Sequence, residues 1–307
     1  MTDPIDPFVA VPPALRDALL AWYAETARPL AFRATSDPYS VLVSELMAQQ
    51  TQAARAAEAW IAWMARWPTV RDLADAPVAD VLRAWAGLGY NRRALLLHRA
   101  AKAIVADHGG DVPADVAALE ALPGVGPYTA RAVAAIAFGV PLGAVDTNVR
   151  RVLGRIAAGG AEAFDAAGLQ ALADAVVPSD AAAAWTHALM DLGAGLCRPS
   201  RPRCADCPVI AWCRYAAGER PVAVASPKAA GAGPHRPVPV FASTNRWLRG
   251  RILDRARMAP DGAWVGYGEP MGDHREIAVR EAVLAMTSEG LLEARERGES
   301  LEARLPR

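Results

Sequence analysis

The four cysteines of this 307-residue chain all lie in one short segment with the spacing Cys197-x6-Cys204-x2-Cys207-x5-Cys213. In a reducing compartment such a cluster of thiols is more typical of a metal site than of two disulfides. Structural zinc sites usually present two close cysteine pairs, whereas this segment has one. Prolines keep the segment out of helix, so its thiolates can surround a four-iron four-sulfur cluster, which we predict, with zinc as the alternative.

Arginines separate the first two cysteines in the sequence RPSRPR, which places Arg198, Arg201 and Arg203 on one small loop. Guanidinium groups on a rigid base suit the phosphates of a polyanion. The loop is therefore a candidate phosphate clamp, and a solvated basic loop is the alternative.

A glycine-rich turn, LPGVGPYTA, lies between two expected helices. Gly124 and Gly126 permit a tight turn, and Pro127 is suited to the first position of the next helix. Backbone N–H groups near these glycines would then point outward together and bind a phosphate without reading sequence. An ordinary turn is the alternative, because a pair of glycines is weak evidence by itself.

The elements that must position these segments are mostly helices. Up to about residue 215 the chain is rich in Ala and Leu, is interrupted by Pro and Gly, and lacks sustained alternation of apolar and polar residues. We expect one long helix from Pro38 to Trp67, with Glu45, Gln49 and Gln52 forming a polar stripe along it. The other expected helices cover residues 14–27, 70–75, 77–86, 92–108, 115–121, about 127–138 and from about 147.

The C-terminal part of the chain differs in composition. Residues 219–240 are dense in Pro, Ala and Gly, as linkers are. Residues 241–307 then contain a basic helix, a second helix and an alternating segment around a glycine that predicts a hairpin. This order indicates a small winged-helix-like α+β module.

The overall composition excludes some classes of protein. Basic and acidic residues number 33 each, so composition alone gives no reason to expect nucleic-acid binding. No stretch approaches the roughly 20 apolar residues of a membrane helix. The start, MTDPIDPFVAVPP, lacks the basic and apolar regions of a secretory signal, so we expect a cytoplasmic protein without membrane contact.

The order of motifs, SELMAQQTQ, GLGY, LPGVGPYT, VDTNVRRV, MDLGAGLC and the cysteine segment, resembles the helix-hairpin-helix DNA glycosylases of the endonuclease III superfamily, and within it the MutY-type adenine glycosylases. The resemblance covers about residues 14–215. It implies an all-α, two-lobed fold with an iron-sulfur cluster loop, in which residues 30–145 form a six-helix barrel and residues 1–29 and 146–218 form the second lobe. The C-terminal module does not resemble the Nudix-like domain that many of these enzymes carry.

The resemblance implies two catalytic carboxylates. Cleavage of an N-glycosidic bond needs a proton for the departing base and a negative group for the cationic sugar. Glu45 matches the acid, which would protonate adenine and whose pKa an apolar pocket would raise. Asp146 matches the group that stabilises or traps the sugar cation. Taken without this context, Glu45 is typical of a helix surface and Asp146 of a helix N-cap.

A tyrosine distinguishes subfamilies of the superfamily. Tyr128 stands where bifunctional relatives place a lysine, and a phenol cannot form a Schiff base with the sugar. We therefore expect a monofunctional enzyme, with Tyr128 lining the sugar side of the pocket. Simple packing of its ring beside the turn is the alternative.

Other motif positions imply contacts with DNA. Arg28, Phe32 and Arg33 match the entrance of the adenine pocket, and His187 stands where relatives carry Glu or Gln toward adenine. The expected DNA-contacting residues of the QQTQ and GLGY motifs are Gln49, Gln50 and Tyr90, of which the last two would insert near the orphaned base. Core packing is the alternative for Tyr90, and a purely structural role is the alternative for His187.

The sequence therefore predicts a base-excision-repair enzyme that removes adenine opposite 8-oxoguanine or guanine from double-stranded DNA. We expect a nucleoid-associated monomer with one 4Fe-4S cluster. The basic face of its C-terminal module would add a DNA contact or dock a repair protein, or would simply be solvated. The alternatives are a thymine or uracil mismatch glycosylase and a non-catalytic, iron-sulfur DNA-binding or redox-sensing protein.

Overall fold

The computed structural model describes residues 11–219, 240–298 and 300–307 of the chain. These residues form two compact units. In described residues, unit 1 contains 11–45, 113–121 and 125–219, and unit 2 contains 46–112, 122–124, 240–298 and 300–307. The linker predicted over 219–240 lies almost wholly outside the described residues, and the predicted lobe boundaries stay predictions.

Unit 1 is helical, as expected. Its core is formed by apolar faces of α2, α10, α11 and α12, around the fully buried ring of Trp185. The elements of unit 1 are α2 (Pro13–Thr26), η1 (Ala31–Ala34), most of α3 (Pro38–Ala48), α8 (Val116–Ala121), α9 (Pro127–Ala137), α10 (Thr147–Ala158), η2 (Ala161–Ala163), α11 (Ala166–Ala175), α12 (Ala182–Gly195), η3 (Cys204–Asp206) and η4 (Ile210–Trp212).

Helix α10 shows how local sequence sets these bounds. Asp146 caps its N-terminus, and Gly159 ends it in the left-handed conformation with φ 75°. Between them, buried residues at helical spacing, including Val149, Val152 and Ile156, pack toward α12. The helix thereby places Asp146 at a fixed point beside the core of unit 1.

Unit 2 contains a second set of helices and the C-terminal module. In its core the Trp63 ring makes edge-to-face contacts with two other rings. The distance between ring centres is 4.6 Å to Trp67 and 5.5 Å to Trp85. The elements of unit 2 are the end of α3, α4 (Ala53–Arg66), α5 (Val70–Asp75), α6 (Val78–Ala84), α7 (Arg92–Asp107), η5 (Phe241–Ser243), α13 (Asn245–Met258), β1 (Val265–Gly266), α14 (Glu276–Ser288), β2 (Glu293–Arg297) and β3 (Ser300–Arg304).

The long helix predicted from Pro38 to Trp67 is wrong. Helix α3 ends at Ala48, and α4 begins at Ala53. The physical reason is Arg93, whose buried guanidinium donates hydrogen bonds to the carbonyls of Leu46 at 2.7 Å and Gln49 at 2.6 Å. These carbonyls lie at the end of α3 and just beyond it, so Gln49 and Gln52 do not continue a polar stripe along one helix.

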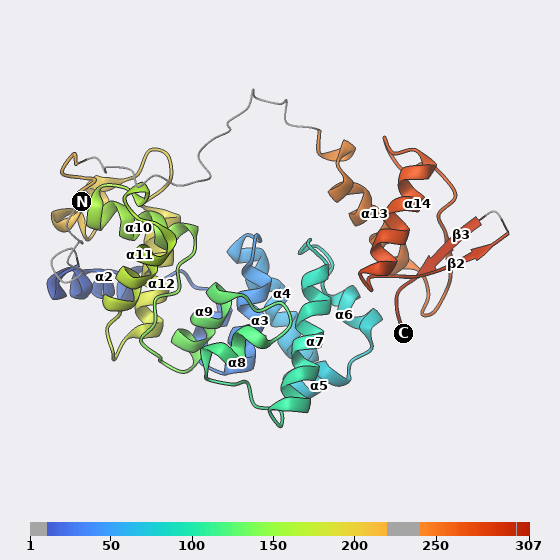
Figure 1. Cartoon of the computed structure of the whole chain (residues 1–307), viewed down its shortest axis with the longest axis horizontal. Coiled ribbons are helices and arrows are strands. Elements are labelled where there is room, and N and C mark those ends of the chain that lie inside the picture. The colour runs from blue at the N-terminus through green and yellow to red at the C-terminus, as the bar shows by residue number, and fades with distance from the viewer. Residues whose placement is uncertain (1–10, 220–239, 299) are drawn as a thin grey trace. The chain divides into compact units, whose positions relative to one another are not determined.

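The C-terminal module combines two packed helices with a small sheet, and the predicted hairpin is confirmed (Figure 1). Strands β2 and β3 pair antiparallel, with Ala294 opposite Ala303. The short strand β1, which sequence patterning missed, pairs with β3 to give the order β1-β3-β2. None of the helices in the described part of the chain has the length and hydropathy needed to cross a membrane.

Candidate active site

Glu45 is a buried carboxyl on an apolar helix. Asp37 begins α3 by accepting hydrogen bonds from the backbone N–H and the hydroxyl of Ser40, at 2.8 and 2.7 Å. The helix that follows is buried on nearly all sides, including Leu42 and Leu46, and Glu45 itself is 9% exposed. The helix therefore holds the carboxyl away from bulk water.

The hydroxyl of Tyr128 donates a hydrogen bond to Glu45 Oε2 at 3.1 Å. Tyr128 lies in the first turn of α9, which starts at Pro127 as the sequence predicts. Burial raises the pKa of Glu45 to about 7, and the charge of Asp146 adds to this rise. The Tyr128 hydrogen bond and the charge of Arg33 act in the opposite direction without reversing the pKa shift. Near neutral pH Glu45 can therefore hold and release a proton.

Asp146 has the N-cap role that its sequence context also allowed. Its Oδ1 accepts from the backbone N–H groups of Asn148 at 2.8 Å and Val149 at 2.7 Å. Its Oδ2 accepts from Asn148 Nδ2 at 3.1 Å. These three hydrogen bonds fix the direction of the carboxylate at the N-terminus of α10. Capping and a catalytic role are compatible, because a capped carboxylate is a fixed negative charge.

Arg28 and Arg33 converge on a residue that sequence reasoning missed. Asp191 on α12 is 4% exposed and accepts two hydrogen bonds from the Arg33 guanidinium, both at 2.7 Å. It also accepts from Arg28 Nε at 2.6 Å. Burial opposes ionisation of Asp191, but the bonds and charge of Arg33 outweigh it and lower the pKa of this carboxyl. Its only signal in the sequence is its place in the MDLG motif.

This arrangement leaves the Nε donor of Arg33 unused. Arg33 Nε is buried, and no residue in the described ranges accepts a hydrogen bond from it. His187 lies one turn before Asp191, and burial together with the charge of Arg33 lowers the pKa of His187 to about 4. Its imidazole is therefore neutral at physiological pH. Phe32 lies beside Arg33 on η1.

The residues predicted to insert into DNA lie in unit 2. Gln50 and Tyr90 both have positive φ, 53° and 44°, which is uncommon for residues with side chains. Arg93, also missed by sequence reasoning, bridges their two loops, since it binds the carbonyl of Gln49 at 2.6 Å and that of Gly89 at 3.2 Å. The Tyr90 ring is 43% exposed, so it is not a core residue.

The two glycines of the predicted phosphate cradle differ. Gly124 has φ 82°, and a Cβ there would lie 2.6 Å from Leu96 Cβ, so both conformation and space require glycine. Gly126 is the N-cap of α9 in an extended conformation, with open space where a Cβ would be. Only Gly124 is therefore required by the fold of the turn.

The cysteine segment forms one small pocket in unit 1, lined by all four thiols, Cys197, Cys204, Cys207 and Cys213. None of them forms a disulfide. Arg155 of α10 holds the segment by donating to the carbonyls of Arg198 at 2.7 Å and Pro199 at 3.0 Å. Four reduced thiols around one pocket are the donor set that an iron-sulfur cluster requires.

The three arginines of this segment are not equivalent. Arg203 pairs with Asp206 at 2.7 Å, and Arg198 Nε donates to the carbonyl of Gly195 at 2.9 Å. Arg201 is exposed, has φ 51°, and makes no ion pair within the described ranges. Arg201 is thus the arginine of the loop most readily available to a phosphate.

The sequence and the fold correspond to a known class of DNA repair protein. Residues 43–176 match the family described as HhH-GPD superfamily base excision DNA repair protein. The solved structure of a thermostable thymine-DNA glycosylase is similar, with 29% identity and a TM-score of 0.62, over 66% of this chain and 95% of that chain.

Curated relatives define the family more closely. An adenine DNA glycosylase of Mycobacterium tuberculosis (strain CDC 1551 / Oshkosh) is 40% identical over 298 residues, which cover 93% of this chain and 95% of that protein. An adenine DNA glycosylase of Homo sapiens is 42% identical over 222 residues, or 67% of this chain and 40% of that protein. The chain belongs to the adenine DNA glycosylases of the HhH-GPD superfamily, which confirms the resemblance drawn from its motifs.

Proposed function

We propose that the chain excises adenine from DNA by hydrolysing the N-glycosidic bond of a nucleotide that has been rotated out of the duplex. Rotation is needed because side chains cannot reach this bond inside stacked DNA. Membership of the adenine DNA glycosylases supports this function. The observation that carries it is Glu45, a buried carboxyl with a pKa of about 7, bonded to Tyr128 and within the electrostatic influence of Asp146.

In the proposed reaction Glu45 gives its proton to N7 of adenine, and the bond between N9 and the sugar C1′ breaks with its electron pair leaving on the base. The sugar is left as an oxocarbenium-like cation, which the fixed negative charge of Asp146 stabilises. Water then adds its hydroxide to C1′ and returns a proton to Glu45. The acid is thus regenerated, and no oxidant or reductant is consumed.

The cluster around Asp191 is suited to hold the departing base. Asp191 accepts one hydrogen bond from each terminal nitrogen of Arg33, whereas Arg33 Nε is buried and has no acceptor in the described part of the chain, so a ligand can use this N–H donor. An adenine ring nitrogen can accept from it. Neutral His187 can add a hydrogen bond without placing a second positive charge beside the base. Phe32 is the expected stacking partner.

Tyr128 makes the proposed enzyme monofunctional. Its hydroxyl donates to Glu45, and it has no amine with which to form a covalent imine to the sugar. Incubation with substrate and borohydride should therefore give no protein–DNA crosslink. A strong crosslink would contradict a purely hydrolytic mechanism.

We also propose that the four cysteines hold one 4Fe-4S cluster, which fixes the loop that carries Arg201. Purified protein should contain about four irons and four acid-labile sulfides per chain, and should be brown. One zinc per chain would contradict this assignment.

For the C-terminal module, the two helices followed by the β2–β3 hairpin support a winged-helix type of fold.

The substrate is tested directly by the identity of the released base. Duplexes with A opposite 8-oxoguanine, A opposite G, T opposite G and U opposite G are incubated with excess protein and then heated in alkali to cleave abasic sites. The proposal expects cleavage at adenine with both partners and none at thymine or uracil. Cleavage at thymine or uracil alone would favour the mismatch enzyme suggested by the thymine-DNA glycosylase likeness. Binding without any cleavage would favour a non-catalytic protein.

A further inference from the structure

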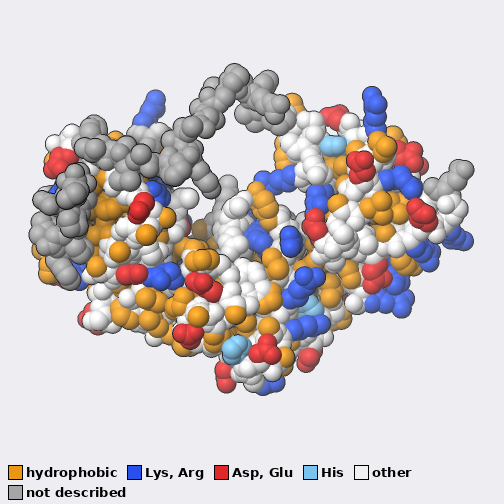
Figure 2. Space-filling view, in the orientation of Figure 1, with side chains coloured by type: hydrophobic (Ala, Val, Ile, Leu, Met, Phe, Trp, Pro, Cys, Tyr) orange, Lys and Arg blue, Asp and Glu red, His pale blue; other side chains and the backbone are white. Residues whose placement is uncertain are grey.

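Ion pairs between arginine and an acidic side chain are common in this chain. Figure 2 shows basic and acidic side chains interspersed over the C-terminal helices and strands, where Arg295 pairs with Glu302 at 2.7 Å. Such pairs on a surface contribute little free energy and by themselves indicate no function. The pair of Arg131 with Asp174 in unit 1 differs, because both of its members also bind the backbone of one residue, Gly143.

Gly143 is bound at both its N–H and its carbonyl. The N–H donates to Asp174 Oδ1 at 2.8 Å, and the carbonyl accepts from Arg131 Nε at 2.9 Å and from Gln170 Nε2 at 2.8 Å. Arg131 and Gln170 also donate to the same carboxylate oxygen of Asp174. We call these three side chains the Gly143 clamp. The clamp fixes the backbone of Gly143 to two helices, to α9 through Arg131 and to α11 through the other two side chains.

The loop that contains Gly143 lies directly against α11. A Cβ at Gly143 would lie 2.6 Å from Ala173 Cβ and 2.7 Å from the carbonyl carbon of Ala173. Backbone atoms of a helix cannot move aside as the end of a flexible side chain can, so a larger residue would push the loop away from α11. The close contact and the clamp therefore hold the same point of the loop.

Asp146 follows the clamped residue by three positions. Ala144 is 4% exposed and Val145 packs against the core of unit 1, so the segment between the clamp and Asp146 is itself held in place. Helix α10 holds Asp146 from the other side, since the N–H groups of its first turn bind the carboxylate. The backbone of Asp146 is thus fixed both before and after this residue.

Helix α9 connects the clamp to the other carboxyl of the proposed reaction. Tyr128, in the first turn of α9, donates to Glu45, and Arg131 lies three residues later on the same helix. Residues three apart on a helix are neighbours on its surface. One helix therefore contacts both Glu45 and the loop that leads to Asp146, and it sets the distance between the acid and the anion.

We propose that the Gly143 clamp positions the active site by holding the Asp146 carboxylate at a fixed place relative to Glu45. Its three side chains are positioning residues, because they act on the reaction only through the loop that ends at Asp146. The inference rests on the proposed function, since it concerns the same reaction. Precise placement matters, because a misplacement of about 1 Å can cost about 100-fold in rate.

The hold on Asp146 is tested by amide hydrogen exchange of the full chain, followed by mass spectrometry on peptides that cover residues 143–149. Arg131→Met keeps the aliphatic part of the side chain and removes the donors of the clamp. The N–H groups of Asn148 and Val149, which the Asp146 carboxylate binds, should then exchange about tenfold faster or more. Peptides from α12 should exchange at the unmutated rate.

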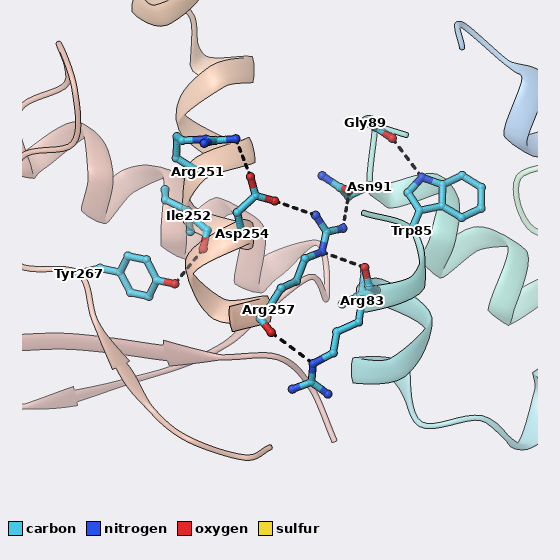
Figure 3. A network of polar contacts seen from close by, with 10 residues as sticks. Arg83, Trp85, Gly89, Asn91, Arg251, Ile252, Asp254, Arg257 and Tyr267 are labelled. Carbon is cyan, nitrogen blue, oxygen red and sulfur yellow. Dashed lines mark hydrogen bonds and ion pairs between the residues drawn. The ribbon is translucent and has the colours of Figure 1, made fainter. Parts of the chain in front are cut away.

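Arg83 in unit 2 provides a matched control, because it makes the same two kinds of contact as Arg131. It donates to the carbonyl of Arg257 at 3.5 Å (Figure 3) and pairs with Asp261 at 2.6 Å. The Arg83 side chain is 24% exposed and that of Arg131 is 18% exposed. Arg83→Met should change neither the exchange of the two α10 amides nor the rate of excision.

Single-turnover excision of adenine separates positioning from stability. It is measured at saturating protein and at a temperature where urea unfolding shows each variant to be fully folded, so a purely structural role cannot change the rate. Arg131→Met and Asp174→Asn should each lower the rate about tenfold or more and leave the affinity for the duplex unchanged. The double variant should be no slower than the slower single variant, because the two side chains act as one unit. Gly143→Ala, which leaves the clamp side chains in place, should also lower the rate.

The positioning proposal and the proposed function can fail separately. The positioning proposal is overturned if the clamp variants exchange the two amides at the unmutated rate, or if faster exchange is accompanied by a normal rate of excision. If the unmutated chain excises no adenine while the clamp variants exchange faster, the clamp does hold Asp146 and only the proposed function fails. If the unmutated chain excises adenine and the clamp variants behave like Arg83→Met, only the positioning proposal fails.

Discussion

The hydroxyl of Tyr128 keeps the pKa of Glu45 lower than burial alone would set it. It donates to Glu45 Oε2 at 3.1 Å, and this bond favours the charged carboxylate. Tyr128→Phe removes the bond with almost no change in volume. A hydrogen bond to a charged group is worth about 1.5–3 kcal/mol, and one pKa unit corresponds to about 1.4 kcal/mol. We therefore expect the substitution to raise the pKa of Glu45 from about 7 to about 8 or higher.

The assay is the pH dependence of single-turnover adenine excision, from about pH 5 to about pH 9. A general acid must be protonated to act, so the rate of the unmutated protein should fall as pH rises through about 7. In Tyr128→Phe the midpoint of this fall should move at least about one unit to higher pH. At about pH 8 the protonated fraction of Glu45 would then rise from roughly one tenth to roughly one half.

The midpoint is the informative quantity, because loss of the phenol can also change the maximal rate. Tyr215→Phe, which deletes a hydroxyl from a ring held by Arg155 beside the cysteine segment, is the matched control and should leave the midpoint in place. A midpoint that stays unchanged in Tyr128→Phe, or moves to lower pH, would refute the assignment of Glu45 as the titrating acid.

Three further predictions concern stability, measured by urea unfolding. The pKa of Glu45 in the folded chain is raised, so ionisation of this carboxyl lowers the free energy of unfolding as pH rises from about 4.5 to about 7. Glu45→Gln should therefore stabilise the chain by about 3 kcal/mol at pH ~8 and hardly at all at pH ~4.5. Equal effects at both pH values would contradict the burial argument. Asp191→Asn leaves the buried Arg33 without its ion pair and should destabilise the chain by about 3 kcal/mol or more, whereas a loss under about 1 kcal/mol would show that the pair is not structural. Gly124→Ala forces a side chain into a left-handed, crowded position and should cost about 1–3 kcal/mol, while Gly126→Ala, in open space, should be nearly neutral; similar costs at both glycines would count against the steric argument.

Features encoded over a few neighbouring residues were predictable from sequence. The C-terminal hairpin, the helix start at Pro127 and most helices before residue 215 were predicted from the spacing of apolar residues and from the positions of proline and glycine. The structure contains all of these elements. Glu45 and Tyr128 were each predicted from motifs as pocket residues, but the hydrogen bond that joins their side chains was not predicted. A raised pKa of Glu45 was also expected, because an acid that works near neutral pH needs an apolar pocket, and the pKa is raised to about 7.

Features that depend on distant segments were not predictable. The Asp191 carboxylate joins Arg28 and Arg33 across 163 and 158 residues of sequence, and no local pattern signals such a pairing. The break after Ala48 depends on Arg93, a charged residue whose type predicts a surface position but that is 8% exposed. The two-residue strand β1 is too short to show alternation.

The central claim, a protonated Glu45 acting with a negative Asp146, is tested most directly by single-turnover adenine excision from an A:8-oxoguanine duplex at saturating protein. Glu45→Gln and Asp146→Asn should each abolish excision while binding the duplex nearly as well as the unmutated protein. Glu58→Gln, the same change at an exposed glutamate on α4, should excise at the normal rate. Near-normal excision by either site variant would contradict the proposed mechanism.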